Sequence, residues 1–101
     1  MGKTLGILVC TPKYFDHVMR LAGAARKAGV DIRIFFTGEG VALTQHPAFA
    51  ELSRIARVKI CDVSYQRLGF EGIASGLDKR DHSNQLEHAL MVSEVDRYVV
   101  F

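Results

Sequence analysis

The sequence predicts an α/β fold with three layers, in which helices cover both faces of a mainly parallel sheet of four to five strands. Short apolar stretches typical of buried strands alternate along the chain with stretches of helical periodicity. The connections between these stretches are short, as in proteins built from strand-helix-strand units. At 101 residues the chain has room for one hydrophobic core. Residues 1–101 are therefore expected to form a single domain.

The first half of the chain is expected to supply two strands and a helix. Residues 5–10 are continuously apolar, which is typical of a strand covered on both faces. Helical spacing of apolar residues begins at Phe15, and Gly29 predicts where that helix ends. Residues 30–36 first alternate between apolar and charged side chains and then end in two phenylalanines, which indicates a second strand. The glycine-rich residues 38–40 predict a loop.

The next part of the chain repeats the alternation and then loses it. A second helix is expected over residues 47–57, followed by a third strand over residues 58–61 and a short helix to Gly69. Residues 70–82 show no clear period, and their glycines and charges indicate a loop with at most one helical turn. Their apolar members could form an assembly surface or cap the core; these are Phe70, Ile73 and Leu77.

A last helix and strand complete the predicted sheet. Ser83 is a candidate cap for this helix. Leu86, Ala89 and Leu90 are expected on its apolar side, with Val92 as a further candidate. Residues 98–101 then predict a final strand. The carboxyl ends of parallel strands are where ligands and chemistry gather in such folds.

Composition excludes several classes of function. The net charge of +2 is small, and no run of five like charges occurs, so nucleic-acid or membrane-surface binding is not expected. No stretch approaches the ~20 apolar residues of a membrane span. Two cysteines do not make a disulfide framework, which favours a reducing compartment. We expect a soluble cytoplasmic domain.

Metal and nucleotide sites have little support in the sequence. The four histidines, at positions 17, 46, 82 and 88, do not pair with one another or with cysteine at metal-ligand spacing, so no metal is expected. The loop at residues 38–40 lacks the lysine of a phosphate loop and the third glycine of a dinucleotide fingerprint, and no cofactor is expected. Backbone amides of Gly38 and Gly40 could still hold an anion, although a tight turn is the better account of these glycines.

Cys61 is the main candidate for chemistry. It closes the third predicted strand and precedes a predicted helix, and a helix start favours a thiolate. Arg67 would add to this effect if its side chain folds back toward the sulfur. Asp62 acts against it, because a neighbouring carboxylate raises the pKa of a thiol. The alternative is a small buried hydrophobic residue, since free cysteine is often buried.

Cys10 and His82 are possible supporting residues. Cys10 ends the first predicted strand at the same sheet edge. A flavodoxin-like strand order would place Cys10 about 5 Å from the third strand, whereas an intervening second strand would place it about 10 Å away, beyond disulfide reach. His82, in the unpatterned segment, could exchange a proton with Cys61 or simply be solvated.

The order of these segments resembles the DsrE/DsrF family of small sulfur-relay proteins, including the TusD-type subunits. The resemblance runs through nearly the whole chain. It rests on the alanine-rich first helix, the strand and loop at residues 34–41, Cys61 with Arg67 and Gly69, and the ending at residues 96–101. Asp62-Val63-Ser64-Tyr65 departs from the small apolar residues that usually follow the TusD-type cysteine.

The resemblance implies a three-layer α/β fold whose second strand separates the first from the third. It also implies a homo- or hetero-oligomer, often trimeric or hexameric, and we expect a homo-oligomer. The resemblance further implies a cysteine that accepts sulfane sulfur as a persulfide and passes it to a partner protein. A sulfur carrier acting through Cys61 is the first functional hypothesis. The alternatives are a non-catalytic oligomeric or regulatory binding domain and a flavodoxin-like cofactor binder.

Overall fold

The computed structural model describes residues 3–101 and contains a parallel sheet in the order β4-β3-β2-β1-β5. The strands of this described part are β1 (Thr4–Val9), β2 (Asp31–Phe36), β3 (Arg57–Cys61), β4 (His82–Ser83) and β5 (Arg97–Val100). Every strand pair in it is parallel. The predicted α/β class is confirmed, and β2 lies between β1 and β3, as the family resemblance implied.

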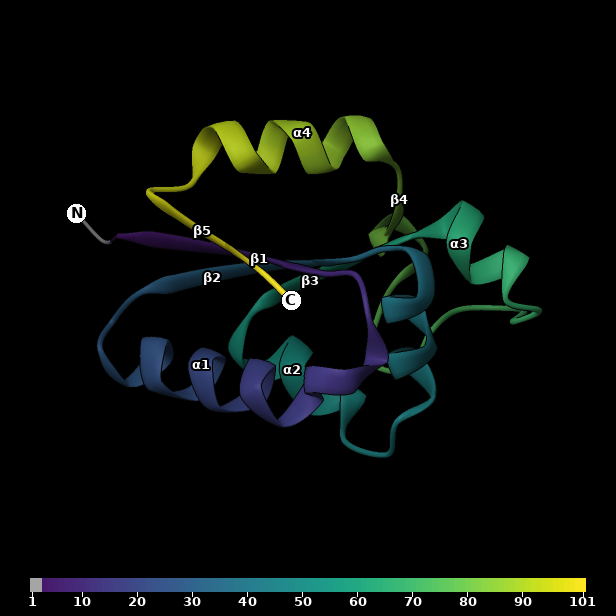
Figure 1. Cartoon of the computed structure of the whole chain (residues 1–101), viewed down its shortest axis with the longest axis horizontal. Coiled ribbons are helices and arrows are strands. Elements are labelled where there is room, and N and C mark those ends of the chain that lie inside the picture. Colours follow the sequence, from purple (N-terminus) through teal and green to yellow (C-terminus); the bar gives the residue numbers. More distant parts are fainter. Residues whose placement is uncertain (1–2) are drawn as a thin grey trace.

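Helices cover both faces of the sheet (Figure 1). Helices α1 (Phe15–Lys27) and α2 (Phe49–Ile55) lie on one face, and α4 (Gln85–Glu94) lies on the other. The short helix α3 (Asp62–Arg67) continues from β3 beyond the carboxyl edge. Three 3₁₀ segments complete the described elements: η1 (Pro12–Tyr14), η2 (Gly38–Gln45) and η3 (Lys79–Asp81). The three layers therefore match the prediction.

The main core lies between the sheet and the α1–α2 layer. Helix α1 buries Phe15, Val18, Ala22 and Ala25, which recur at helical spacing on one face. Gly29 ends this helix with a φ of 77°, and the amide of the next residue donates to the carbonyl of Ala25 at 2.9 Å. The opposite sheet face has a smaller core, made by Phe35, Cys61 and Met91.

Gly40 fixes the loop after β2 against the end of β1. A Cβ at this position would overlap the carbonyl oxygen of Val9 and lie 2.8 Å from its carbonyl carbon. The amide of Gly40 donates to the carbonyl oxygens of Cys10 at 3.1 Å and Thr37 at 3.0 Å. The close approach of two backbone segments therefore requires glycine here.

Several local predictions were wrong. Residues 38–40 begin the 3₁₀ segment η2 instead of a plain loop. Arg57 begins β3 instead of ending α2. Asn84 caps α4, because its side chain accepts from the Glu87 amide, whereas Ser83 belongs to β4. A two-residue strand such as β4 has too few residues to show a period.

The predicted apolar side of α4 does not face the core. Leu86 is 71% exposed and Leu90 is 54% exposed, while Met91 is the buried residue of this helix. Met91 packs over Phe35, and its sulfur lies so close to Gly6 that a Cβ there would be 2.8 Å from it. The glycine in β1 thus makes room for the helix side chain, which the sequence pattern of α4 alone could not indicate.

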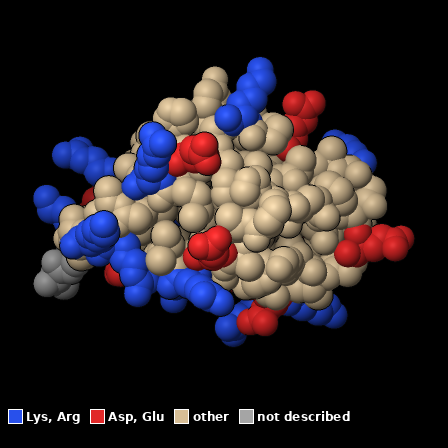
Figure 2. All heavy atoms as spheres, turned by 90° about the horizontal axis from the view of Figure 1, so that it is seen from below, with Lys and Arg blue, Asp and Glu red and all other residues tan. Residues whose placement is uncertain are grey.

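Charges are unevenly distributed on the face seen from the α1–α2 side. Figure 2 shows Lys and Arg side chains gathered toward the end where the strands begin, and a broad area with few charges toward the carboxyl edge. None of the helices in residues 3–101 is long and apolar enough to cross a membrane.

Candidate functional site

Cys61 lies at the carboxyl edge of the sheet, in a row with two other residues. Val9, Phe36 and Ile60 are aligned across β1, β2 and β3. Cys10, Thr37 and Cys61 each follow one member of that row, so they occupy the same level at the strand ends. Cys61 is also the residue that precedes the first turn of α3.

Hydrogen-bond donors from three elements converge near the Cys61 thiol. Ser64, in the first turn of α3, accepts from the Gly38 amide at 3.1 Å and keeps its own hydroxyl proton available. Gln85, at the start of α4, donates to the Thr37 hydroxyl at 2.9 Å. The neutral thiol makes no capping hydrogen bond within the described chain. A thiolate is a much stronger acceptor and would draw on these donors.

These donors lower the pKa of Cys61. Burial is the largest single influence and by itself raises the pKa of this thiol, which is only 6% exposed. Hydrogen bonds from the side chain and backbone of Ser64, and then from Gln85 and Thr37, together outweigh burial. The result is a thiol pKa below its usual value, in a small core formed with Phe35 and Met91. A lowered pKa favours the nucleophilic form of cysteine.

The carboxylate of Asp62 is held by two neighbours. Its Oδ1 lies 2.8 Å from His82 Nδ1, and its Oδ2 accepts from Gln66 at 2.6 Å. The charge of Asp62 is not among the influences that set the pKa of Cys61. His82 and Gln66 thus occupy both oxygens of this carboxylate, and neither contact involves the thiol.

The structure separates the other residues predicted for this site from the sulfur. Both cysteines are free, and β2 lies between the strands that carry them. Within residues 3–101, the side chain of Arg67 has no hydrogen bond or ion pair; it is exposed at the far end of α3. Both ring nitrogens of His82 contact groups other than Cys61, because Nε2 also accepts from the Ala74 amide at 3.0 Å.

The glycines predicted to bind an anion have partners within the protein. The Gly38 amide donates to Ser64, and the Gly40 amide donates to two backbone carbonyls. Gly38 has a φ of 54°, which this residue type tolerates. Through Ser64, Gly38 is linked to the Cys61 environment, and anion binding by the loop stays a prediction.

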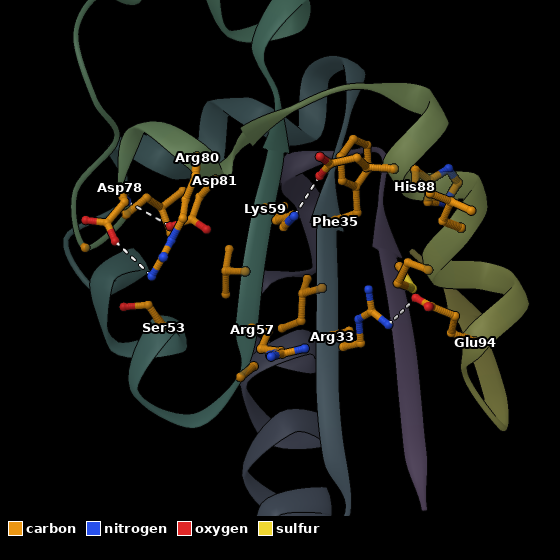
Figure 3. A pocket seen from close by; sticks show the side chains of 18 residues that line it. Arg33, Phe35, Ser53, Arg57, Lys59, Asp78, Arg80, Asp81, His88 and Glu94 are labelled. Carbon is orange, nitrogen blue, oxygen red and sulfur yellow. Dashed lines mark hydrogen bonds and ion pairs between the residues drawn. The ribbon is translucent and has the colours of Figure 1, made fainter.

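A groove of about 770 Å³ lies on the α4 side of β2 and β3 and does not include Cys61 (Figure 3). Arg33 and Lys59 point into it, paired with Glu94 at 2.8 Å and Glu87 at 2.6 Å, respectively. Its four cationic side chains face four carboxylates; they are Arg33, Arg57, Lys59 and Arg80, against Asp78, Asp81, Glu87 and Glu94. This balance gives the groove no strong preference for a charged ligand. Among the described residues, no three His, Cys, Asp or Glu side chains converge as metal ligands would.

Three residues of the candidate site were not selected from the sequence: Thr37, Ser64 and Gln85. Ser64 could have been found from the sequence, because it is the third residue of the helix that Cys61 precedes. The backbone amide of that third residue lies close to the side chain of the residue before the helix. Thr37 follows a predicted strand at the correct edge. Gln85 reaches the site only because α4 crosses back over the sheet, and no sequence signal indicates that.

Fold and site together define a three-layer α/β protein with a free cysteine, whose thiolate is favoured by hydrogen-bond donors, at the carboxyl edge of its sheet. No family model matches the chain, and no curated protein matches its sequence. Among solved structures, the chain is similar to the YchN protein from E. coli, with a TM-score of 0.74, 18% identity and 100% of both chains covered. This likeness supports the predicted three-layer α/β fold, and at this identity it shows the fold alone.

Proposed function

We propose that this chain is a sulfur carrier of the sulfurtransferase type, which accepts sulfane sulfur on Cys61 as a persulfide and passes it to a partner protein. The observation that carries the proposal is the set of donors from Ser64, Gln85 and Thr37, which lowers the pKa of a free thiol despite its burial. The family resemblance around Cys61 and the DsrE-like fold agree with this chemistry.

The loading step needs a thiolate on Cys61. The Cys61 sulfur attacks the outer sulfur of a donor persulfide and forms a new sulfur-sulfur bond. The bond between that sulfur and the donor breaks, and the donor leaves as a thiolate that takes up a proton. No net oxidation or reduction occurs. Lowering the pKa of Cys61 increases the fraction of protein that can attack near neutral pH.

The same hydrogen-bond donors also assist the unloading step, by stabilising Cys61 as the leaving thiolate. A partner thiolate attacks the outer sulfur of the Cys61 persulfide, and Cys61 leaves as a thiolate. A leaving thiolate of low pKa departs faster. The hydrogen bonds of Ser64, Gln85 and Thr37 therefore favour release as well as loading. The 6% exposure of Cys61 restricts access, so a donor or acceptor must present its sulfur at the sheet edge.

The direct test is intact mass spectrometry after incubation with a low-molecular-weight persulfide. Wild type and Cys10→Ser are expected to gain about 32 Da, the mass of one sulfur, while Cys61→Ser gains none. Cys10→Ser is the matched control because it removes the other free cysteine of the chain. A wild-type protein that stays unmodified would contradict the proposal.

The burial of Cys61 favours one alternative, a non-catalytic oligomeric or regulatory binding domain. In that case Cys61 is a core residue of ordinary reactivity beside Phe35 and Met91. Alkylation of the native protein distinguishes the two functions. Rapid modification of Cys61 at neutral pH would argue against the binding domain, and protection equal to that of a buried thiol would support it.

The setting of this function is also a proposal. Two free cysteines suit the reducing cytoplasm, where a persulfide carrier could reload repeatedly. A homo-oligomer, trimeric or hexameric, would cover the apolar side chains that α4 and β5 expose. The most exposed of these are Leu86, Leu90 and Val100.

A further inference from the structure

His82 joins the start of α3 to the loop that precedes η3. Its side chain is 6% exposed and packs edge-on against the ring of Tyr65, with 4.9 Å between ring centroids. Tyr65 is itself buried, and its hydroxyl donates to the carbonyl of Glu71 at 3.2 Å. These contacts hold the imidazole in one orientation, so each ring nitrogen has a defined partner.

The partners determine which nitrogen carries the proton. The Ala74 amide is a donor, so His82 Nε2 accepts from it and carries no proton in this arrangement. The neutral ring then has its proton on Nδ1, which lies 2.8 Å from Asp62 Oδ1 and donates to it. Gln66 donates to the second carboxylate oxygen. Both oxygens of Asp62 are thus occupied on the side of α3 and His82.

We propose that His82 is a positioning residue for Cys61, because it holds the carboxylate of Asp62 in a fixed hydrogen-bonded place and so keeps that charge from approaching the sulfur. The inference rests on the proposed function of Cys61 as a sulfur acceptor. Asp62 directly follows Cys61 in the chain, and a free carboxylate at that position could rotate toward the thiol. Repulsion between the two negative charges would then favour the protonated thiol.

The two functions of the His82 ring can be separated by substitution. Asn places its amide nitrogen near the position of Nδ1, so His82→Asn can keep the hydrogen bond to Asp62. Gln extends to the position of Nε2, so His82→Gln can keep the contact with the Ala74 amide and loses the donor to Asp62. The two variants therefore differ mainly in whether Asp62 is held.

The measurement is the rate of Cys61 alkylation by iodoacetamide across pH, in a Cys10→Ser background. His82→Gln is expected to raise the thiol pKa and to slow alkylation roughly two- to fivefold below that pKa, while His82→Asn stays near wild type. Adding Asp62→Asn removes the charge, so His82→Gln should then have no further effect. Equal shifts in both His82 variants, or a shift that persists with Asp62→Asn, would overturn the proposal.

A second variant covers the case in which His82→Gln does not fold. Gln66 is exposed on α3, so Gln66→Ala should leave the fold intact while releasing Asp62 Oδ2. Because His82 still holds Oδ1 in this variant, alkylation is expected to stay near the wild-type rate. A slowing that disappears when Asp62→Asn is added would show that Gln66 holds the charge away from the sulfur, and would overturn the proposal. Thiol alkylation needs no sulfur donor, so failure of this inference is distinguishable from failure of persulfide transfer.

Discussion

Gln85 Nε2 lies 2.9 Å from Thr37 Oγ1, although the two residues are 48 positions apart in the chain. This bond joins the start of α4 to the end of β2, directly beside Cys61. Both residues contribute to lowering the pKa of the thiol. Helix α4 thus supplies a hydrogen-bond donor that lowers the pKa of a cysteine at the end of β3.

Replacing Gln85 should weaken the thiolate. Gln85→Leu removes a donor to the sulfur and leaves Thr37 without its partner, so we expect a higher thiol pKa and slower alkylation of Cys61. Gln45→Leu is a matched control, because Gln45 donates to Thr44 at 3.1 Å without acting on Cys61. Identical pH profiles of alkylation in both variants would exclude a role for Gln85.

Ser64→Ala should have a larger effect than Gln85→Leu. Among the influences that lower the pKa of Cys61, the hydroxyl of Ser64 is the strongest. Its loss also removes the acceptor of the Gly38 amide, which should cost about 1 kcal/mol of unfolding free energy. The pH profile of alkylation and a urea titration measure the two effects. Ser93→Ala, at an exposed hydroxyl on α4, should change neither.

Gly40→Ala should destabilise the fold. The added Cβ would overlap the Val9 carbonyl, and relieving this overlap requires one of two backbone segments to move, at a cost of about 1–3 kcal/mol or more. Gly23→Ala is the matched control on α1, where no atom lies within 4 Å of the added Cβ. That substitution should stabilise by about 0.5–1 kcal/mol, since alanine favours helices. Urea denaturation compares the stabilities of Gly40→Ala and Gly23→Ala, and equal denaturation midpoints of the two variants would contradict the expected difference.

Stability should fall as the pH drops through about 6.5, partly because of His88. Burial lowers the pKa of His88, which stacks on Phe35 and lies 2.8 Å from the Tyr98 hydroxyl. The unfolded chain therefore binds this proton at a higher pH than the folded chain, and acidification favours unfolding. Unfolding free energy measured from pH 8 to pH 5 should decline less in His88→Gln than in wild type. His17→Gln, at an exposed position of α1, should keep the wild-type decline.

The apolar surface of α4 should mediate self-association. Leu86 and Leu90 lie one turn apart and are both largely exposed. Light scattering after size exclusion is expected to give wild type a mass equal to that of several chains. The double variant Leu86→Glu/Leu90→Glu is expected to form a smaller assembly. Ile73→Glu tests another exposed apolar site, in the loop before η3. A monomeric wild type would contradict self-association, and dissociation by Ile73→Glu alone would assign the contact to that loop.

Much of the fold could be predicted from local patterns. The strand that ends at Cys61, the helix from Phe15 and the stop at Gly29 depend on residues close together in the chain, and each lies where expected. The errors share a different cause. Ser83 joins a two-residue strand by pairing opposite Cys61, and Leu90 is exposed because Met91 fills the space above Gly6. Those outcomes depend on contacts between distant segments.

By itself, the sequence determined the α/β class, the position of Cys61 at the end of a strand, and its place before a short helix, because periodicity and helix-end preferences are local properties. Only the tertiary structure decided the environment of that thiol. The donors on Thr37, Ser64 and Gln85 come from three elements, and the carboxylate of Asp62 is held by His82, which is 20 positions away. A thiol pKa depends on atoms a few ångströms from the sulfur, and folding alone brings these atoms together.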